Sequence, residues 1–128
     1  MSTSPINTGQ TKFYAENFSV NVLAASVGTV IATYIVPSKC RARLLSFGNY
    51  LSLVALWGDV TWRMNVNGIP MAPYNAIRDQ IGYAAQRSDV EQLEAGGGSV
   101  ITVTADNADL LLAVDVGVSL AWELIFQE

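Results

Sequence analysis

The stretch "LAVDVGVSLAWELIF", residues 112–126, decides the fold class of this chain. Apolar side chains occupy every second position, at Leu112, Val114, Val116, Val118, Leu120, Trp122, Leu124 and Phe126. Small or polar residues fill the positions between them, at Ala113, Asp115, Gly117, Ser119, Ala121 and Glu123. A period of two is that of a β-strand, whose successive side chains point to opposite faces. The pattern predicts an antiparallel sheet with one face in a core, in which Gly117 divides the run or bends one long strand.

The same period recurs along most of the chain. Five further strands are predicted at residues 18–22, 28–36, 41–50, 60–66 and 99–105. In the fourth of these, Val60, Trp62, Met64 and Val66 share one face, and Gly48-Asn49 allows a bulge in the third. Asn67-Gly68 suits a tight hairpin turn, because both residues tolerate positive φ. Since a strand rather than a helix follows Gly96–Gly98, this glycine run is predicted to be a hairpin loop and not a phosphate-binding loop.

Short strands, glycine, asparagine and proline turns and the lack of a long amphipathic helix together predict an all-β fold. We expect an antiparallel β-sandwich of the jelly-roll type with about eight strands. An immunoglobulin-like sandwich is the alternative, although its cysteine and tryptophan markers are missing. The polar residues 1–17 are predicted to be a flexible N-terminal arm, and residues 18–128 a single β-sandwich domain.

The composition suggests that part of the surface is covered by other chains. Hydrophobic residues make up 51% of the 128 residues and charged residues only 14%, where soluble domains have roughly 25% charged residues. A chain of this length has a limited interior, so we expect a homo-oligomer or a docked subunit.

Several partner classes are not expected. The net charge is −4 and the longest basic cluster spans Lys39 to Arg43, so a basic face for nucleic acid is lacking. The longest nearly apolar run, Leu51 to Trp57, is far shorter than the roughly 20 residues that span a bilayer. No signal peptide opens the sequence. We therefore expect neither nucleic acid nor a membrane as partner, and synthesis in the cytoplasm.

The residue inventory also predicts a protein that is not an enzyme. The chain has no histidine and a single cysteine, Cys40. Histidine is the commonest general base and the partner of most serine and cysteine nucleophiles, and zinc sites are built mainly from histidine and cysteine, so none of these sites is expected. The acids Asp59, Asp79, Asp89, Glu91 and Glu94 lie in predicted loops with no sign of pairing. The run "DNAD", residues 106–109, resembles the start of a calcium loop but lacks its later ligands, so a turn is expected. We expect no catalytic residue, no cofactor and no metal.

The segment "NVNGIPMAPYNAIRDQIG", residues 65–82, is too broken for a core element and too apolar for a solvated loop. It can lie over the end of its own sandwich, contact a neighbouring chain, or do both. Tyrosine, arginine and apolar anchors are typical of interfaces. The predicted interface residues are Thr3 and Ile6 in the arm, Trp57, and Tyr74, Ile77, Arg78 and Asp79 in this segment.

Five stretches together resemble small β-sandwich virion structural proteins of tailed phages, the capsid decoration or cement proteins. They are "VPSKCRARLLSFGNYLS", "VTWRMNVNG", "IRDQIG", "GGGSVITVTADN" and "DVGVSLAWELI". The resemblance implies a jelly-roll-like subunit on the capsid surface of a virion, made in the host cytoplasm. It also implies a homotrimer whose partner is the major capsid protein, with no catalytic residues. The alternative is a carbohydrate-binding or host-recognition module that uses the rings of Tyr50, Trp57 and Trp62.

Overall fold

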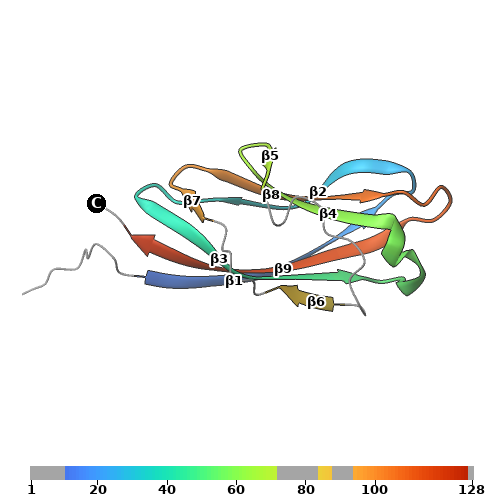
Figure 1. Cartoon of the computed structure of the whole chain (residues 1–128), viewed down its shortest axis with the longest axis horizontal. Coiled ribbons are helices and arrows are strands. Elements are labelled where there is room, and N and C mark those ends of the chain that lie inside the picture. Colours follow the sequence, from blue (N-terminus) through green and yellow to red (C-terminus); the bar gives the residue numbers. More distant parts are fainter. Residues whose placement is uncertain (1–10, 72–83, 88–93, 127–128) are drawn as a thin grey trace, which may run out of the picture.

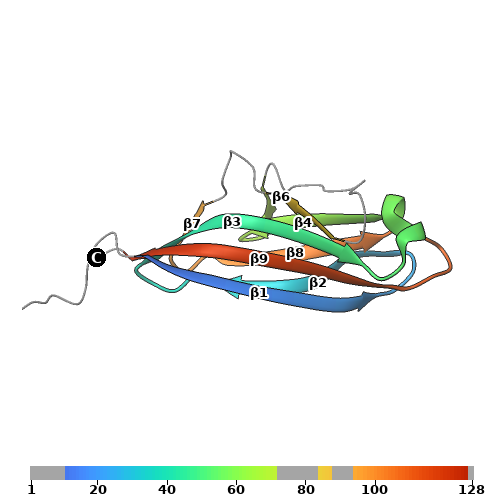
Figure 2. The same ribbon diagram turned by 90° about the horizontal axis from the view of Figure 1, so that it is seen from below.

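The structure is a computed structural model that describes residues 11–71, 84–87 and 94–126. In chain order its elements are β1 (Thr11–Val22), β2 (Ser26–Ile35), β3 (Cys40–Leu51), the short 3₁₀ helix η1 (Val54–Asp59), β4 (Val60–Val66), β5 (Ile69–Pro70), β6 (Ala84–Arg87), β7 (Glu94–Gly96), β8 (Val100–Asn107) and β9 (Val114–Phe126). They form two layers along one long axis (Figures 1 and 2). The chain is therefore all-β in its described part, as the two-residue period predicts.

The strands form two antiparallel sheets packed face to face. The first sheet has the order β1-β9-β3-β6, with β7 also paired to β3, and the second has the order β2-β8-β4-β5. From β1 to β4 each strand joins the sheet opposite to the previous one, and β8 and β9 also lie in opposite sheets. This is the double Greek-key winding of a jelly roll, so that prediction is confirmed. The immunoglobulin-like alternative is wrong, because there the first two strands pair within one sheet.

The inner face of β9 forms the middle of the core. Val114, Val116, Val118, Leu120, Trp122 and Leu124 are all buried, as their spacing predicts. Gly117 does not divide the run, since β9 is one continuous strand paired with β1 on one side and β3 on the other. Trp62, from β4 of the opposite sheet, donates its indole N–H to the Gly117 carbonyl oxygen at 3.3 Å and so joins the two layers.

Aromatic side chains close the side of the sandwich where β1 and β2 run as edge strands. Tyr14 of β1 stacks on Tyr34 of β2, with ring centroids 5.0 Å apart. Tyr34 stacks in turn on Trp122 of β9, with centroids 5.9 Å apart. The three rings therefore link both sheets where the two edges leave the core open.

The structure corrects three boundaries predicted from the sequence. Strand β1 begins at Thr11, so residues 11–17 of the predicted arm are hydrogen-bonded along β9; residues 1–10 lie outside the described residues. Leu112 is exposed in a loop, because β9 starts only at Val114. The register shift in β3 falls between Leu44 and Ser46 instead of at Gly48-Asn49, since Leu45 is the extra residue opposite β9.

Two predicted turns have different outcomes. The hairpin at Asn67-Gly68 is confirmed, with φ values of 52° and 83° between the paired strands β4 and β5. The glycine run Gly96–Gly98 is not a hairpin loop. Strand β7 pairs with β3 in the first sheet, whereas β8 belongs to the second, so these glycines carry the chain from one layer to the other.

Candidate interaction surfaces

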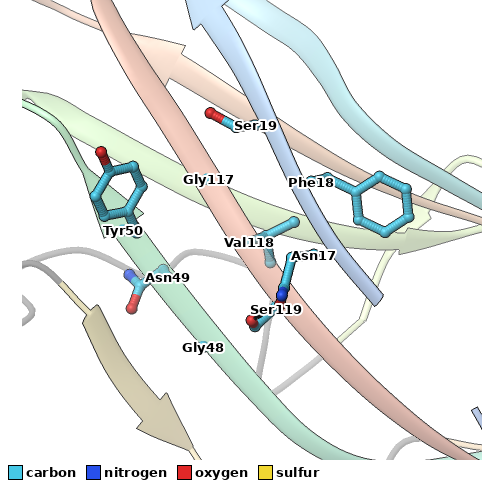
Figure 3. Close-up of a pocket in the computed structure, with 9 residues that line it drawn as sticks. All are labelled: Asn17, Phe18, Ser19, Gly48, Asn49, Tyr50, Gly117, Val118 and Ser119. Atoms are coloured by element: carbon cyan, nitrogen blue, oxygen red, sulfur yellow. Dashed lines mark hydrogen bonds between the residues drawn. The ribbon is translucent and has the colours of Figure 1, made fainter. Parts of the chain in front are cut away.

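A shallow groove lies on the outer face of the first sheet. It has a volume of about 320 Å³ and crosses three strands (Figure 3). The cross-strand register sets the residues of this face, which are Asn17 and Ser19 of β1, Gly117 and Ser119 of β9, and Gly48 and Tyr50 of β3. Because Gly48 and Gly117 have no side chains, the backbone forms the floor of the groove.

The described residues that line the groove are uncharged, and one wall of the groove is aromatic. Tyr50 is 40% exposed, and its ring lies against Gly117, where an added Cβ would be 2.8 Å from Tyr50 Cδ1. The Ser119 hydroxyl donates a hydrogen bond to Asn17 Oδ1. No charged residue is among the described residues that line the groove. Its chemistry therefore suits an uncharged ligand with hydroxyl or amide groups.

A second surface is formed by three loops at one end of the sandwich, at the right of Figure 1. Backbone hydrogen bonds hold the loops together: Ala25 N–H donates to Asp109 O at 2.8 Å, Ala108 N–H to Asp59 O at 2.8 Å, and Ser52 N–H to Asp115 O at 3.0 Å. The loops that follow β1, β3 and β8 thus form one connected surface.

Large apolar side chains project from this surface, which we call the leucine end. Its members are Leu23, Val27, Leu53, Leu110, Leu111 and Leu112, all of them exposed. Leu110 and Leu111 are 78% and 88% exposed. Isolated exposed leucines are common on protein surfaces, but a cluster on joined loops indicates an interaction site.

Residues of the run 106–109, whose sequence resembles the start of a calcium loop, fix the conformation of the loop that follows β8 and carries Leu110–Leu112. Asp109 Oδ2 accepts the N–H groups of Leu111 at 3.0 Å and Leu112 at 2.7 Å. Asn107, which is buried, accepts the Asp109 N–H and donates its own amide to the Leu112 carbonyl. The turn predicted at 106–109 lies further along the chain: Asp106 and Asn107 are the last residues of β8, and the backbone bends at Leu110 and Leu111.

The leucine end is also acidic. Asp59, Asp109 and Asp115 lie in or beside its loops, and none of them belongs to the ion pairs between described residues. Asp106 is different, because it pairs with Arg63 and accepts the Gly28 N–H at 2.8 Å. Three carboxylates are thus left without a cationic partner around the exposed leucines.

Four basic residues lie toward the opposite end of the molecule, Lys12, Lys39, Arg41 and Arg43, whereas Arg63 of β4 lines a hollow with Asp59 at the leucine end. Lys12 lies at the start of β1 and Lys39 in the loop between β2 and β3, and both are exposed. Arg41 pairs with Glu94 at 3.4 Å, and Arg43 pairs with Glu123. We call this region the basic end.

The basic end has exposed apolar side chains of its own. Ile35 and Val100 are direct cross-strand partners on the outer face of the second sheet, and both are exposed, Ile35 to 61%. Backbone bonds from Val36 N–H to Ser99 O and from Gly98 N–H to Val36 O fix the loops beside them. Among the described residues, each end of the sandwich therefore combines apolar side chains with charges of one sign that lie outside the ion pairs.

Most of the predicted interface residues are not placed by the structure. Thr3, Ile6, Tyr74, Ile77, Arg78 and Asp79 lie outside the described residues, and so does the side chain of Trp57 in η1. These assignments stay predictions. Of the rings considered for carbohydrate binding, Trp62 is fully buried in the core, and Tyr50 borders the groove.

The described residues hold no group of three or more histidine, cysteine, aspartate or glutamate side chains placed to bind a metal ion. Within the same ranges, no helix has the length and apolar content needed to cross a bilayer. Cys40 is the first residue of β3 and is buried.

The sequence reading missed the leucine end. Leu112 was assigned to the core face because it continues the two-residue period of β9, and Leu110 and Leu111 precede that run. The signal that could have indicated a loop is the Asn107–Asp109 turn, which ends β8 and caps the following backbone. Three consecutive leucines after such a turn cannot all face one core.

Comparisons with known proteins give little beyond this geometry. No family model matches the chain, and no curated protein matches its sequence. Among solved structures, a chain from the Bacillus endospore appendages, described as a novel family of disulfide-linked pili, is similar over 100% of both chains. The TM-score is 0.43 and the sequence identity 14%. The jelly-roll assignment made above rests on the strand order of this chain, and on that order alone we conclude that it is an all-β sandwich protein.

Proposed function

We propose that this protein is a non-enzymatic structural subunit that self-associates and braces a larger protein lattice. The observation that carries the proposal is the leucine end, where five exposed leucines on hydrogen-bonded loops, with Val27 at the start of β2, lie at one tip of the sandwich. Transfer of a leucine side chain from water into a contact is worth about 1.5–3 kcal/mol. Loops that are already fixed lose little conformational entropy on binding, which favours a contact there.

The residue inventory supports a structural role over a catalytic one. The chain has no histidine, and two of its described acids, Glu94 and Glu123, are used in ion pairs with Arg41 and Arg43. Asp106 is likewise paired with Arg63. These three acids are therefore engaged in ion pairs on the sandwich surface.

The finer proposal is a capsid decoration subunit. In this proposal the protein lies on the capsid surface of a virion, contacts the major capsid protein and forms a trimer, after synthesis in the host cytoplasm. The sequence resemblance to tailed-phage cement proteins and the jelly-roll strand order support it. Repeated weak contacts on a lattice would add avidity to each subunit.

Sedimentation of the purified full-length chain tests self-association. We expect a mass above that of one 13.8 kDa chain at micromolar concentration. A monomer under these conditions would contradict the proposal. The capsid assignment is tested separately, by identifying what copurifies with the protein from its native source and in what stoichiometry. Recovery with a capsid shell in a fixed ratio is expected, and recovery without any lattice protein contradicts the finer proposal.

A saccharide-binding module is the second candidate, and the groove beside Tyr50 favours it. An exposed ring next to neutral hydroxyl and amide groups matches the amphipathic faces of a sugar. The test is a glycan array probed with the intact chain and with Tyr50→Ala, Tyr50→Phe and Asn17→Ala. If the module binds sugars, Tyr50→Ala and Asn17→Ala lose binding and Tyr50→Phe keeps most of it. An array without specific signals, or signals that survive Tyr50→Ala, argues against this candidate.

A further inference from the structure

We infer that the protein associates head to tail, with the leucine end of one copy docked on the basic end of the next copy. The inference rests on the proposed self-association and specifies the two surfaces that make it. The occupant of the leucine end is therefore a second copy of this chain. The argument uses the charge and the exposed apolar side chains at the two ends.

Both ends offer apolar area, and their charges are complementary. The leucine end presents Leu110 and Leu111 beside Asp59, Asp109 and Asp115, which have no cationic partner among the described residues. The basic end presents Ile35 and Val100 near Lys39, with Lys12 at the start of β1. Lys12 and Lys39 are likewise absent from the ion pairs of the described chain. Contact between the two ends would bury leucines while bringing carboxylates near ammonium groups.

The two charged ends cannot neutralise each other within one molecule. Strand β9 has 13 residues and runs from the leucine end to the basic end (Figure 2). At about 3.3 Å per residue it spans roughly 43 Å. Charges are screened beyond about 8 Å at physiological ionic strength. Only a second molecule can therefore place a lysine close to these carboxylates.

A symmetric contact between two leucine ends is disfavoured by the same charges. In such an isologous dimer each surface meets its own copy, so Asp59, Asp109 and Asp115 would face the same three carboxylates. Like charges brought together at an interface oppose binding. A heterologous contact avoids this repulsion.

A heterologous contact forms a ring if the rotation per step closes, and an open series if it does not. The two surfaces lie at opposite ends of an elongated sandwich (Figure 1), which favours an open series of copies. The mean mass should then grow with protein concentration. A fixed mass of three chains would be a closed head-to-tail ring if Leu111→Gln and Ile35→Gln each dissociate it, and would overturn the head-to-tail contact if neither variant does.

The decisive experiment is complementation between two variants, measured by sedimentation of the full chain. Leu111→Gln removes the apolar anchor of the leucine end, and Ile35→Gln that of the basic end. We expect each variant alone to associate at least about tenfold more weakly than the wild type. When the two are mixed, the intact leucine end of one meets the intact basic end of the other, so a dimer containing one copy of each should form.

Val30→Gln is the matched control, because Val30 is an exposed residue of the same strand as Ile35 but lies away from both ends. This variant should associate like the wild type. Leu110→Gln provides a second variant of the leucine end, should Leu111→Gln fold poorly. A charge exchange gives an independent measurement: Asp59→Lys and Lys39→Glu should each weaken association, and the doubly exchanged chain should recover it.

The outcomes separate this inference from the proposed function. If the wild type is a monomer, both are contradicted. If the wild type associates but Leu111→Gln associates equally well, or the two variants fail to complement each other, self-association stands and the head-to-tail contact is overturned. Loss of association in Val30→Gln would also overturn it, because the contact would then lie on the outer face of β2.

Discussion

Two buried asparagines show how a single side chain affects the stability of this sandwich. Asn49 and Asn107 are each 1% exposed. Asn107 donates to the Leu112 carbonyl at 2.9 Å and accepts the Asp109 N–H at 3.0 Å. Asn49 lies opposite Val118 on the inner face of β3, and within the described ranges neither its Oδ1 nor its Nδ2 has a hydrogen-bond partner. A buried polar group without a partner destabilises a fold, whereas a bonded one can stabilise it.

We therefore predict that Asn49→Leu raises the free energy of unfolding by about 1 kcal/mol, because it replaces an unpaired amide with an apolar group of similar size. Asn107→Leu is the matched substitution at a bonded site. It should lower the free energy of unfolding by about 1–3 kcal/mol. Urea denaturation of both variants is the measurement. Destabilisation of the chain by Asn49→Leu would contradict the prediction.

Gly117 is required by its surroundings rather than by its backbone conformation. A Cβ at this position would lie 2.8 Å from Tyr50 Cδ1 and 3.2 Å from the Phe18 carbonyl oxygen. Gly117→Ala should therefore lower the free energy of unfolding by about 1–3 kcal/mol through overpacking. Gly96→Ala is the control, since nothing lies within 4 Å of an added Cβ there.

Thermal or urea unfolding of the two glycine variants checks this prediction. Adding Tyr50→Ala to Gly117→Ala should recover part of the lost stability, because the closer of the two contacts is then removed. Equal effects of Gly117→Ala and Gly96→Ala would show that the contact with Tyr50 is unimportant.

At the scale of elements, the aromatic stack joins strands that have no backbone hydrogen bonds to each other. Strand β1 pairs only with β9, and β2 only with β8, among the described strands. Tyr34 reaches from β2 across the gap to Tyr14 and Trp122 of the first sheet. Burial raises the pKa of Tyr34 above the ordinary value for tyrosine, and the electrostatic interaction with Cys40 raises this pKa further.

This raised pKa predicts sensitivity to alkali. The pKa of tyrosine in the unfolded chain is about 10. Below this pH, Tyr34 is neutral in both the folded and the unfolded chain, and the packing of its ring contributes fully to the free energy of unfolding. Above that pH the unfolded chain releases the Tyr34 proton while the folded chain retains it, so the free energy of unfolding falls as the pH rises. In the Tyr34→Phe variant, the free energy of unfolding should fall less steeply with pH than in the wild type.

Urea denaturation at a series of pH values above about 9 measures this dependence. Tyr50→Phe is the matched control, because Tyr50 lies on the outer face of the first sheet. We expect it to keep the slope of the wild type. The prediction is wrong if Tyr34→Phe keeps that slope too.

For the whole molecule, the important property is the separation of charge along the long axis. The overall charge is only −4. Among the described residues, Asp59, Asp109 and Asp115 lie at the leucine end without an ion-pair partner, Lys12 and Lys39 lie at the basic end without one, and Glu16 lies between the ends in β1. Ion pairs within the chain, such as Arg43 with Glu123, join residues at the same end of the molecule. They therefore leave the separation of charge between the two ends unchanged. Each molecule therefore presents two different ends to its neighbours.

We predict that self-association weakens when sodium chloride is raised from about 0.05 M to about 0.5 M, because the Debye length falls from more than 10 Å to a few Å. The chain with both Asp59→Lys and Lys39→Glu should show the same salt dependence, and Asp59→Lys alone a smaller one. Sedimentation at matched protein concentrations is the measurement. Association that strengthens with salt would indicate that apolar burial alone drives it.

The sequence by itself determined the element type and the inner faces. The alternation in residues 114–124 and at Val60, Trp62 and Met64 is a local property, because the β-period sends successive side chains to opposite sides wherever the strand lies. All of these apolar residues are buried. The hairpin at Asn67-Gly68 was equally local, since positive φ is tolerated by those two residue types.

Only the tertiary structure decided the strand order, the exposed leucines and the unpaired Asn49. Each depends on residues far apart in the chain: Asn49 is buried because β3 lies beside β9, and Leu110–Leu112 are exposed because three distant loops meet at one end. A two-residue period specifies the two faces of a strand but not its neighbours. The surfaces that this protein offers to partners were therefore fixed by long-range pairing, which local sequence does not encode.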